Sequence, residues 1–495
     1  MKRLFFGIVL TLFVSIQSIA QTDTFNLSDY KLPELKRHAL EFFFDLSGSS
    51  YYHRFLDSYH ASQHYSSTLK DQSQYSVNMY FIYNSYLNSM KKQKESNASF
   101  YLFSQIDNNK NDSRYIRKSF DFAPSFYYST ANRNYYKPKR FYEFGIDFKY
   151  NFDKYRTQAT INEVLGDKFD DIYHNINIFL PLKAGKGRIE QVQDARLANY
   201  LLVELEKQKR IRPTKNTQEI IDLAEFISQL KNKRFFDSRL RRIYELEELD
   251  SYFKSNDFIL NADSRYFTTL SDFWAYGDGP IRNSGKRFSV SLYPGYYSIH
   301  YNRKINGITN TENSLNAYLL NAGLEFKYEK PINLRWQNTI DVIGYTGIME
   351  GNVKGQYPTD NKLRIPNLQI GYFQKFGYYP STRTDATFSY SLRYINYFGK
   401  SDTDKNIVGY ESNGLAVTSG LSINYYISPK FRLNITAHLN YYKDDSTGDL
   451  NYFNNLLISN DLINHFSLLD ESLYVLYQTK HVTKDFRISL QYAIF

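Results

Sequence analysis

Residues 486–494 read FRISLQYAI, and this stretch decides the fold. Apolar and polar residues alternate along it, so one face suits an apolar medium and the other suits water. Similar alternation runs through residues 431–441 and 144–152, and more weakly through 172–180. Most of these runs are as long as tilted strands that cross a membrane, whereas strands of soluble sandwiches are usually shorter. The pattern predicts an all-β transmembrane barrel of about 16 antiparallel strands (16–18).

The composition favours the same fold class. Tyr and Phe number 47 and 38 in 495 residues, and aromatic residues make up 18% of the chain, although the mean hydropathy is −0.54. Membrane barrels combine a polar lumen with aromatic girdles, which gives this average. The net charge of +10 is spread along the chain without a long basic run, which argues against a nucleic-acid partner. Cysteine is absent, which excludes disulfides and cysteine chemistry.

The first 20 residues are typical of a secretory signal peptide. Lys2 and Arg3 precede an apolar run over residues 4–16, and Ser18 and Ala20 provide small residues before a cut at Ala20-Gln21. The run is too short for a membrane-spanning helix, and no Cys follows it to carry a lipid. Residues 1–20 are therefore predicted to be a cleaved leader that directs export.

The predicted connections alternate between tight turns and long polar loops. The tight turns are expected at Asp153-Lys154, Lys330-Pro331, Pro380-Ser381, Pro429-Lys430 and Asp470-Glu471. The long loops are expected at residues 303–314, 350–362, 399–413 and 443–451. Membrane barrels place short turns on the periplasmic side and longer loops outside. Counting strands from the C-terminus by this rule puts the tight turns in the periplasm.

One block of the chain has a helical period. From Gly187 to about residue 255 the apolar residues form three stripes, and a shorter amphipathic stretch includes Tyr266, Phe267 and Trp274. Arg212-Pro213 is expected to end the first helix, and Asn216 to cap the second. The predicted division is N-terminal strands over 21–182, a helical insert over 183–285 that is periplasmic or plugs the lumen, and C-terminal strands over 286–495. We expect Tyr266, Phe267 and Trp274 to pack on the barrel rim.

Taken together, these features resemble outer-membrane β-barrels of the porin or transporter type, in the style of the Bacteroidota. Ile488, Leu490, Tyr492 and the terminal Phe495 resemble the signal read by the barrel-assembly machinery, although Phe495 is out of phase with the apolar set. The resemblance implies an outer-membrane pore or transporter for hydrophilic solutes or an exported polymer. The alternative is a non-conducting scaffold or anchor of a secretion or surface-assembly complex. Lipid, lipopolysaccharide and a periplasmic protein at the insert are the implied partners.

Two groups of residues are candidates for function. Lumen-facing positions that would set charge selectivity are Asp147, Lys149, Arg393, Arg432, Asn434 and Arg487. The basic stretch KNKRFFDSRLRR over 231–242 offers docking residues, or is a solvated helix face; its candidates are Arg234, Arg239, Arg241 and Arg242.

Chemistry-bearing motifs are weak, so we expect no enzyme activity, no metal and no cofactor. His53, His60 and His64 have partial zinc-like spacing without carboxylates to complete a site. His174 and His438 lie on alternating strands, where a nearby Ser would be needed for hydrolysis. The acidic loop at 402–406 starts with calcium-loop spacing but lacks the turn glycine and the distal Glu. Asp444, Asp445 and Asp449 form a second acidic loop, which could share divalent cations with lipopolysaccharide phosphates or be an ordinary solvated loop.

Overall fold

The computed structural model describes residues 25–492 except 59–64, 112–114, 162–163, 232–237, 278–279, 356–360, 401, 403–406, 409, 429–430 and 449–479. The strands before the helices are β1 (Leu35–Ser58), β2 (Tyr65–Asn88), β3 (Lys92–Asn111), β4 (Tyr115–Lys137), β5 (Arg140–Ile161), β6 (Val164–Phe179) and β7 (Leu182–Gln191). Those after them are β8 (Asn283–Ile305), β9 (Ile308–Pro331), β10 (Trp336–Lys354), β11 (Asn361–Tyr378), β12 (Thr384–Gly399), β13 (Ile407–Val408), β14 (Tyr410–Ser428), β15 (Phe431–Gly448) and β16 (Lys480–Tyr492). The helices are η1 (Leu27–Asp29), α2 (Gln193–Lys207), α3 (Thr217–Leu230), α4 (Ser238–Ser255) and α5 (Ser264–Ala275).

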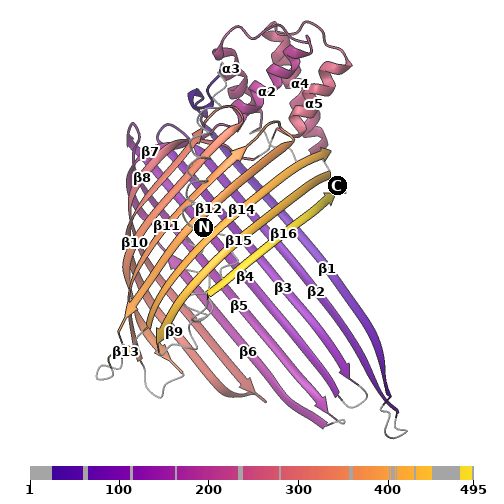
Figure 1. Cartoon of the computed structure of the whole chain (residues 1–495), viewed down its shortest axis with the longest axis vertical. Helices are drawn as coiled ribbons and strands as arrows, with labels where there is room; N and C mark the ends of the chain where they lie inside the picture. The colour runs from indigo at the N-terminus through magenta and orange to yellow at the C-terminus, as the bar shows by residue number, and fades with distance from the viewer. Residues whose placement is uncertain are drawn as a thin grey trace, which may run out of the picture.

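The strands form one barrel-shaped sheet, as Figure 1 shows. Within the described residues the sheet has 16 strands, which confirms the predicted fold class. Strands that follow one another around the wall pair antiparallel. The strand β7 continues the line of β6, because it also pairs with β5 on one side and β8 on the other. The two-residue β13 pairs with β11. The path ends at β1 and β16, and the described residues show no pairing between these two strands. Closure of the barrel there stays a prediction.

Alternation along each strand separates two faces of the wall. On β9, the even-numbered Tyr318, Leu320 and Leu324 are exposed, whereas Leu315 and Asn321 are buried. The same register carries Phe288, Val290 and Leu292 of β8 to the outer surface. An outer face of exposed large apolar side chains on long strands is what a lipid environment requires.

The two ends of the barrel differ. All of α2–α5 lie at one end, together with the start of β1 and the end of β16, as Figure 1 shows; we call it the helix end, and the opposite end the loop end. The helix end has short connections, including residues 332–335 and 379–383. The second contains the turn expected at Pro380-Ser381, whereas Lys330 and Pro331 are the last residues of β9 and lie just before the first. Pro429-Lys430 and Asp470-Glu471 lie outside the described residues.

The loop expected at 443–451 begins later than predicted, because residues 443–448 belong to β15 and pair with β14. Two other predicted connections are wrong. Asp153-Lys154 is no turn, because β5 runs unbroken from Arg140 to Ile161 and pairs with β6 on both sides of it. Residues 303–314 form no long loop, because β8 and β9 meet at Asn306-Gly307, whose φ angles are 54° and 86°. Positive φ at both central residues is the tight hairpin geometry that Asn-Gly favours. Polar residues of long strands were misread as connections in both places.

The helical insert begins later than predicted. Residues 182–191 form β7, and α2 starts at Gln193, ten residues after the expected boundary at 183. The helix α2 ends at Lys207, so Arg212-Pro213 lie in the connection rather than at its end. The cap at Asn216 is confirmed, because its side-chain oxygen accepts from the backbone N–H of Glu219 at 3.1 Å. Among the described helices, none has both the length and the apolar content to cross a membrane.

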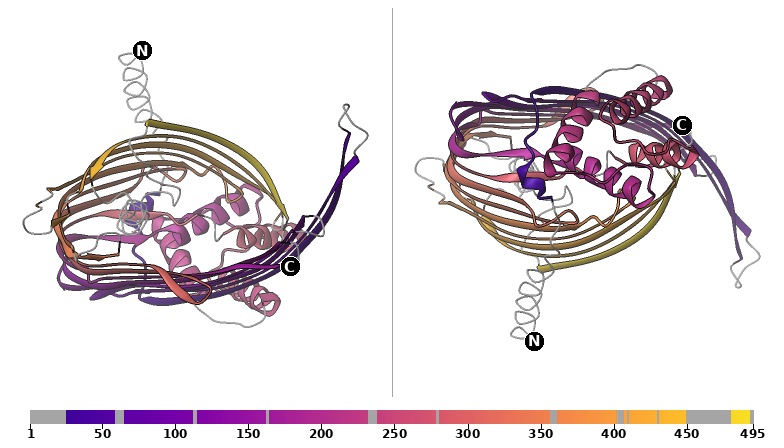
Figure 2. Two further views of the ribbon diagram at one scale, coloured as in Figure 1. Left: turned by 90° about the horizontal axis from the view of Figure 1, so that it is seen from below. Right: turned by 90° about the horizontal axis from the view of Figure 1, so that it is seen from above.

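The helices and the first described residues of the chain share one hydrophobic core. Phe25, Leu27, Tyr30 and Leu32 pack with buried residues of α2–α5, while the wall adds few members, such as Leu35 and Leu334. In Figure 2 several helices lie across the opening of a flattened barrel, and Figure 1 places them beyond the strand ends, not inside the lumen. We call α2–α5 with residues 25–34 the cap.

Candidate functional site: a capped lumen

Asp194, at the start of α2, is the main polar anchor of the cap. Its carboxylate accepts from Arg37 of β1 at 2.7 Å and from Ser228 of α3 at 2.6 Å, and lies 3.4 Å from Lys231 Nζ. Ser228 also hydrogen-bonds Tyr30 at 2.8 Å. Burial alone would raise the pKa of Asp194, but Lys231 and Arg37 offset this and hold it below its usual value. This carboxylate therefore joins the first strand, two helices and the N-terminal segment while ionised.

A second set of contacts fixes the cap to turns of the wall. Tyr200 of α2 donates to the backbone oxygen of Tyr379 at 2.6 Å. Arg383, in the same turn, pairs with Asp272 of α5 and lies 4.5 Å from the ring centre of Tyr276. These contacts are polar or cation–π in character, and each joins one pair of residues. The cap therefore meets this side of the rim through separate contacts rather than a broad apolar surface.

Arg282, just before β8, binds the turn between β9 and β10. It is 1% exposed and donates to the backbone oxygens of Asn333 and Trp336 at 3.0 and 2.9 Å. Burial, with Arg196 nearby, lowers the pKa of Arg282 to about 10. Both guanidinium groups lie over the ring of Tyr379, 5.1 and 5.6 Å from its centre. At neutral pH Arg282 remains charged and holds the end of the helical insert on the wall.

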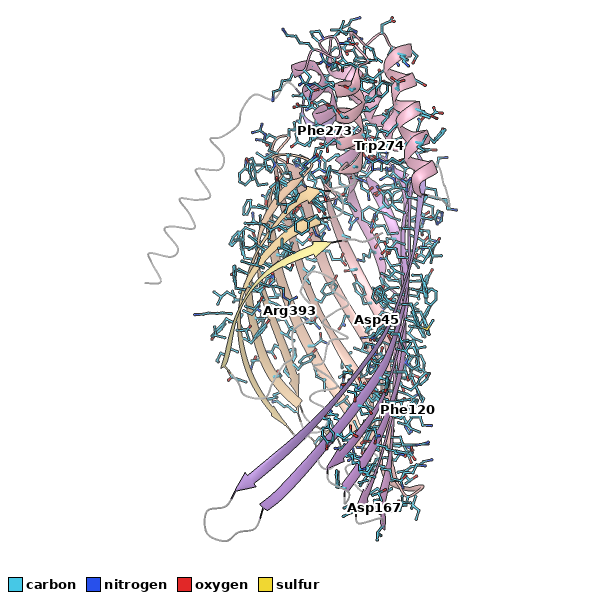
Figure 3. All side chains as sticks on the ribbon, turned by 90° about the vertical axis from the view of Figure 1, so that its right-hand side faces the viewer. Asp45, Phe120, Asp167, Phe273, Trp274 and Arg393 are labelled. Atoms are coloured by element: carbon cyan, nitrogen blue, oxygen red, sulfur yellow. The ribbon has the colours of Figure 1, made fainter. Side chains whose placement is uncertain are left out.

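The predicted rim contacts of the aromatic stretch are wrong. Tyr266 is fully buried inside the cap, with its ring edge-on to Phe253. Trp274, marked with Phe273 in Figure 3, donates from Nε1 to Glu245 of α4 at 2.7 Å. Phe267 stays 47% exposed. The helices pack against one another, so their apolar stripes are buried within the cap.

The proposed docking arginines make contacts within the cap. Arg241 donates to Glu245, one turn along α4, at 2.7 Å, and Arg242 donates to the Ser271 hydroxyl at 2.7 Å. Arg234 lies outside the described residues, and Arg239 belongs to α4. A docking role for this stretch stays a prediction.

The six lumen candidates fall on the inward side of the wall by register. On β5, Asp147 accepts from Ser129, and Lys149 lies on the same face two residues on. Arg432 of β15 donates to Tyr426 at 3.3 Å, and Asn434 donates to Asn424 at 2.8 Å. The remaining two are Arg487 of β16, opposite Thr436, and Arg393 of β12. Cross-strand pairs share a face, so these residues do not gather at one point but line the wall.

Sequence reasoning missed a charged network inside the wall near the helix end. Lys183 of β7 pairs with Glu325 of β9 at 2.8 Å and lies 3.7 Å from Glu143 of β5. Glu143 in turn pairs with Arg133 of β4 at 2.5 Å, and Tyr293 donates to Glu325 at 2.7 Å. Charges at inward positions of alternating strands were the available signal. The network lines the lumen immediately below the cap.

The C-terminal strand carries part of its predicted apolar set on the outer face. Ile488 and Leu490 are exposed, and Tyr492 pairs with Phe431 in register. Phe495 and the leader over 1–20 lie outside the described residues, as do His60 and His64. Of the acidic loops, Asp445 pairs with Lys443, while Asp449 is not described. Across the described part of the chain, no group of three His, Asp or Glu side chains is arranged to hold a metal.

The two strand histidines have different surroundings. His174 lies on the outer face, 6.2 Å from the ring centre of His300. His438 faces the lumen and hydrogen-bonds Asp485 through Nδ1 at 2.9 Å. Register places Ser389, Gly420, His438 and Asp485 in one row across β12, β14, β15 and β16. Ser389 Oγ and His438 Nε2 lie 3.3 and 3.5 Å from the point that a Cβ on Gly420 would occupy.

We expect this row to be catalytically inactive, so that a fluorophosphonate probe does not label the protein. The described residues show no hydrogen bond from Ser389 to His438, and the side chain of Asp485 is 56% exposed, so water weakens its hold on the imidazole. The measurement is intact-mass analysis after probe treatment. Labelling of the wild type that disappears in Ser389→Ala would show an activated serine instead.

No family model matches this chain, and no curated protein matches it. A solved structure that it resembles is the alcaligin outer membrane receptor FauA from Bordetella pertussis, with 8% identity, 94% of this chain and 60% of that chain covered, and a TM-score of 0.30. The translocator domain of the autotransporter NalP from Neisseria meningitidis has 9% identity and a TM-score of 0.26, with 73% of this chain and 87% of that chain covered. The ferric yersiniabactin uptake receptor FyuA from Yersinia pestis has 6% identity and a TM-score of 0.29, with 84% of this chain and 62% of that chain covered. This chain spans about three fifths of either receptor. At such TM-scores these likenesses carry no weight for function, and the resemblance to the Bacteroidota stays a prediction.

Proposed function

We propose that this protein is an integral outer-membrane transport barrel whose periplasmic mouth is closed by the movable cap. The observation that carries the proposal is the cap itself, which lies across the helix end on separate polar contacts. A wide barrel leaves a water-filled lumen unless something fills it. Covering that lumen at one end gives the cap control over passage.

The orientation follows from the two ends of the wall. Barrels of this type keep short turns and both chain ends in the periplasm, and here the short connections, the start of β1 and the end of β16 share the helix end. The exposed apolar residues on β8, β9 and β16 supply the outer surface that lipid would cover. Export by the leader over 1–20 and insertion by the barrel-assembly machinery belong to the same proposal.

Movement of the cap as a unit is supported by where its bonds lie. Its apolar core is formed almost entirely by its own helices and residues 25–32. Outside that core, contacts such as Arg383 with Asp272 and Tyr200 with Tyr379 join it to the wall. These exposed or half-exposed contacts are individually weak and can break without unfolding the helices, whereas the buried Asp194 and Arg282 keep the cap attached to the wall.

The charged network formed by Arg133, Glu143, Lys183 and Glu325 supports passage of polar solutes. It lines the lumen directly below the cap. Lumen side chains set selectivity in barrels that conduct. The rival function, a non-conducting scaffold, predicts the same outer wall but no conducting path.

Planar-bilayer conductance tests this proposal. Gln191 and Asn283 are cross-strand partners at the ends of β7 and β8, so residues 192–282 can be replaced by an Asn-Gly turn that keeps the register. We expect a several-fold larger conductance in this variant than in the wild type. The milder Arg383→Ala variant should raise the frequency of open events, because it removes the ion pair to Asp272.

Arg364→Ala is the matched control. It breaks an exposed ion pair to Glu350 of 3.0 Å at the loop end and should leave conductance unchanged. If neither the shortened variant nor Arg383→Ala conducts while both keep the barrel's heat-modifiable migration, the transport function is wrong and the scaffold holds.

A further inference from the structure

Several buried polar side chains of the lumen wall have unpartnered atoms. Among them are Arg393 of β12, Gln369 of β11 and Asn177 of β6, which are 5%, 2% and 3% exposed. Within the described part of the chain, no hydrogen bond reaches Nη1 or Nη2 of Arg393, or either side-chain amide atom of Gln369 and Asn177. Buried polar groups are nearly always hydrogen-bonded in native proteins. Unpartnered atoms at inward positions therefore point to a missing ligand.

Arg393 is the charged residue of the three, so it most needs a partner. Several other charged residues of the lumen wall are paired, as Arg133 is with Glu143 at 2.5 Å and Lys183 is with Glu325 at 2.8 Å. No carboxylate of the described residues pairs with Arg393. An unpaired charge in a buried position is unfavourable by several kcal/mol. An anion at its terminal nitrogens would remove that cost.

The residues opposite Arg393 on the adjacent strands are small, and Ile343 of β10 lies over one of them, Gly371. Directly opposite it on the two adjacent strands are Gly371 of β11 and Ala416 of β14, two of the smallest side chains. Gln369 lies diagonally across, opposite Ile395, so its amide is the nearest polar group on β11. A guanidinium presents two parallel N–H groups, which match the two oxygens of a carboxylate.

The wall beside this position is apolar, which defines the rest of the ligand. Ile395 and Tyr397 follow Arg393 on the same face of β12 and belong to a buried cluster inside the barrel. The cluster draws its members from β6 and from β8 to β12: Phe179, Tyr297, Ile299, Leu315, Ala317, Leu319, Met349, Val353, Leu363, Ile365, Ile395 and Tyr397. Asn177 borders it from β6, opposite Tyr297. Figure 3 marks Arg393 on the wall below the helices.

We infer that Arg393 and Gln369 bind the carboxylate of an amphipathic solute whose apolar part lies against this cluster. The inference rests on the proposed transport function, for which it names the solute class. It goes beyond a general charge preference, because it requires both a carboxylate and an apolar group in one molecule. The same position lies between the loop end and the charged network below the cap, on the route that the solute would take.

Calorimetric titration of the whole protein in a neutral maltoside detergent tests this assignment. The probe is hexanoate, compared with acetate, which lacks the apolar part, and with hexan-1-ol, which lacks the charge. Hexanoate should bind saturably, and the affinity for acetate should be lower by roughly tenfold or more. Arg393→Gln should weaken hexanoate binding by roughly tenfold or more, because it removes a charge-assisted pair.

Arg364→Gln is the matched control, since Arg364 is exposed and pairs with Glu350 at the loop end. It should bind hexanoate with wild-type affinity. Gln369→Leu should weaken binding while Arg393 keeps its charge, and it tests the inference if Arg393→Gln does not fold. Absence of saturable hexanoate binding in the wild type, or equal affinity in Arg393→Gln and Arg364→Gln, overturns the inference and leaves water as the partner of these atoms.

The stability of the ligand-free barrel gives an independent readout. Arg393→Met should raise the midpoint of heat-modifiable migration, because it removes an unpaired buried charge. A lowered midpoint would mean that Arg393 supports the wall, which also overturns the inference. Because these measurements need no conducting path, their failure is distinct from a failure of the transport function.

Discussion

The Asp194→Ala variant is expected to lose about 3–5 kcal/mol of the free energy that holds the cap together, because it removes the buried carboxylate that pairs with two partly buried cations. Asp194 is 1% exposed and bonds to Arg37, Ser228 and Lys231 at once. Denaturant titration of Trp274 fluorescence in a Trp336→Phe background measures the loss, since the chain has only two Trp. The cap transition should move to lower denaturant while the barrel stays folded.

The matched control for this loss is Glu247→Ala on α4. Glu247 is exposed, and substitutions at such sites usually change stability by less than about 0.5 kcal/mol. Equal midpoints for Asp194→Ala and Glu247→Ala would mean that the carboxylate does not anchor the cap.

Acid should release the cap only below the usual titration range of aspartate. The folded state holds the pKa of Asp194 below its unfolded value of 3.8, through Lys231 and Arg37 acting against burial. The stabilisation is therefore fully present above about pH 4 and is lost as the pH falls through the lower folded pKa. The Trp274 transition should be constant from pH 7 to pH 5 and weaken below pH 4, and this acid dependence should shrink in Asp194→Ala.

Leu421→Arg is expected to destabilise the lipid-inserted barrel by about 2–4 kcal/mol, the cost of a cation on the lipid face near the bilayer midplane. Leu421 lies near the middle of the outward apolar positions of β14 and is 40% exposed. Its neighbour Ser422 faces the lumen, opposite Thr387 and Thr436. Ser422→Arg should therefore cost much less, although the two sites are adjacent in sequence.

Equilibrium unfolding from lipid vesicles compares the two arginine variants directly. In a water-soluble barrel the order would reverse, because an arginine at 421 would be solvated and one at 422 would crowd the interior. A larger loss for Ser422→Arg would therefore contradict both the membrane insertion and the assignment of the faces.

The sequence alone predicted the elements whose signal is local. Alternation over 431–441 and 486–494 identifies strands and states which side chains face lipid, because a side chain's medium is read from its own strand. The cap at Asn216 was found because its partner, Glu219, is three residues away. The Asn-Gly signal for the turn at 306–307 is equally local, but the polar residues around it favoured a longer loop.

The tertiary structure decided what depends on register. Lys183 and Glu325 are 142 residues apart, and Arg37 and Asp194 are 157 apart, so their pairing follows from how β1, β7 and β9 are aligned by every turn between them. The rim aromatics were misplaced for the same reason, since an apolar stripe shows that a helix needs a partner but not which one. The alternation of β12 places Arg393 on the inward face, and its role in charge selectivity stays a prediction. That it stands beside Gly371, Ala416 and an unpartnered Gln369 was decided by the pairing of three strands, because only register determines which side chains meet across a sheet.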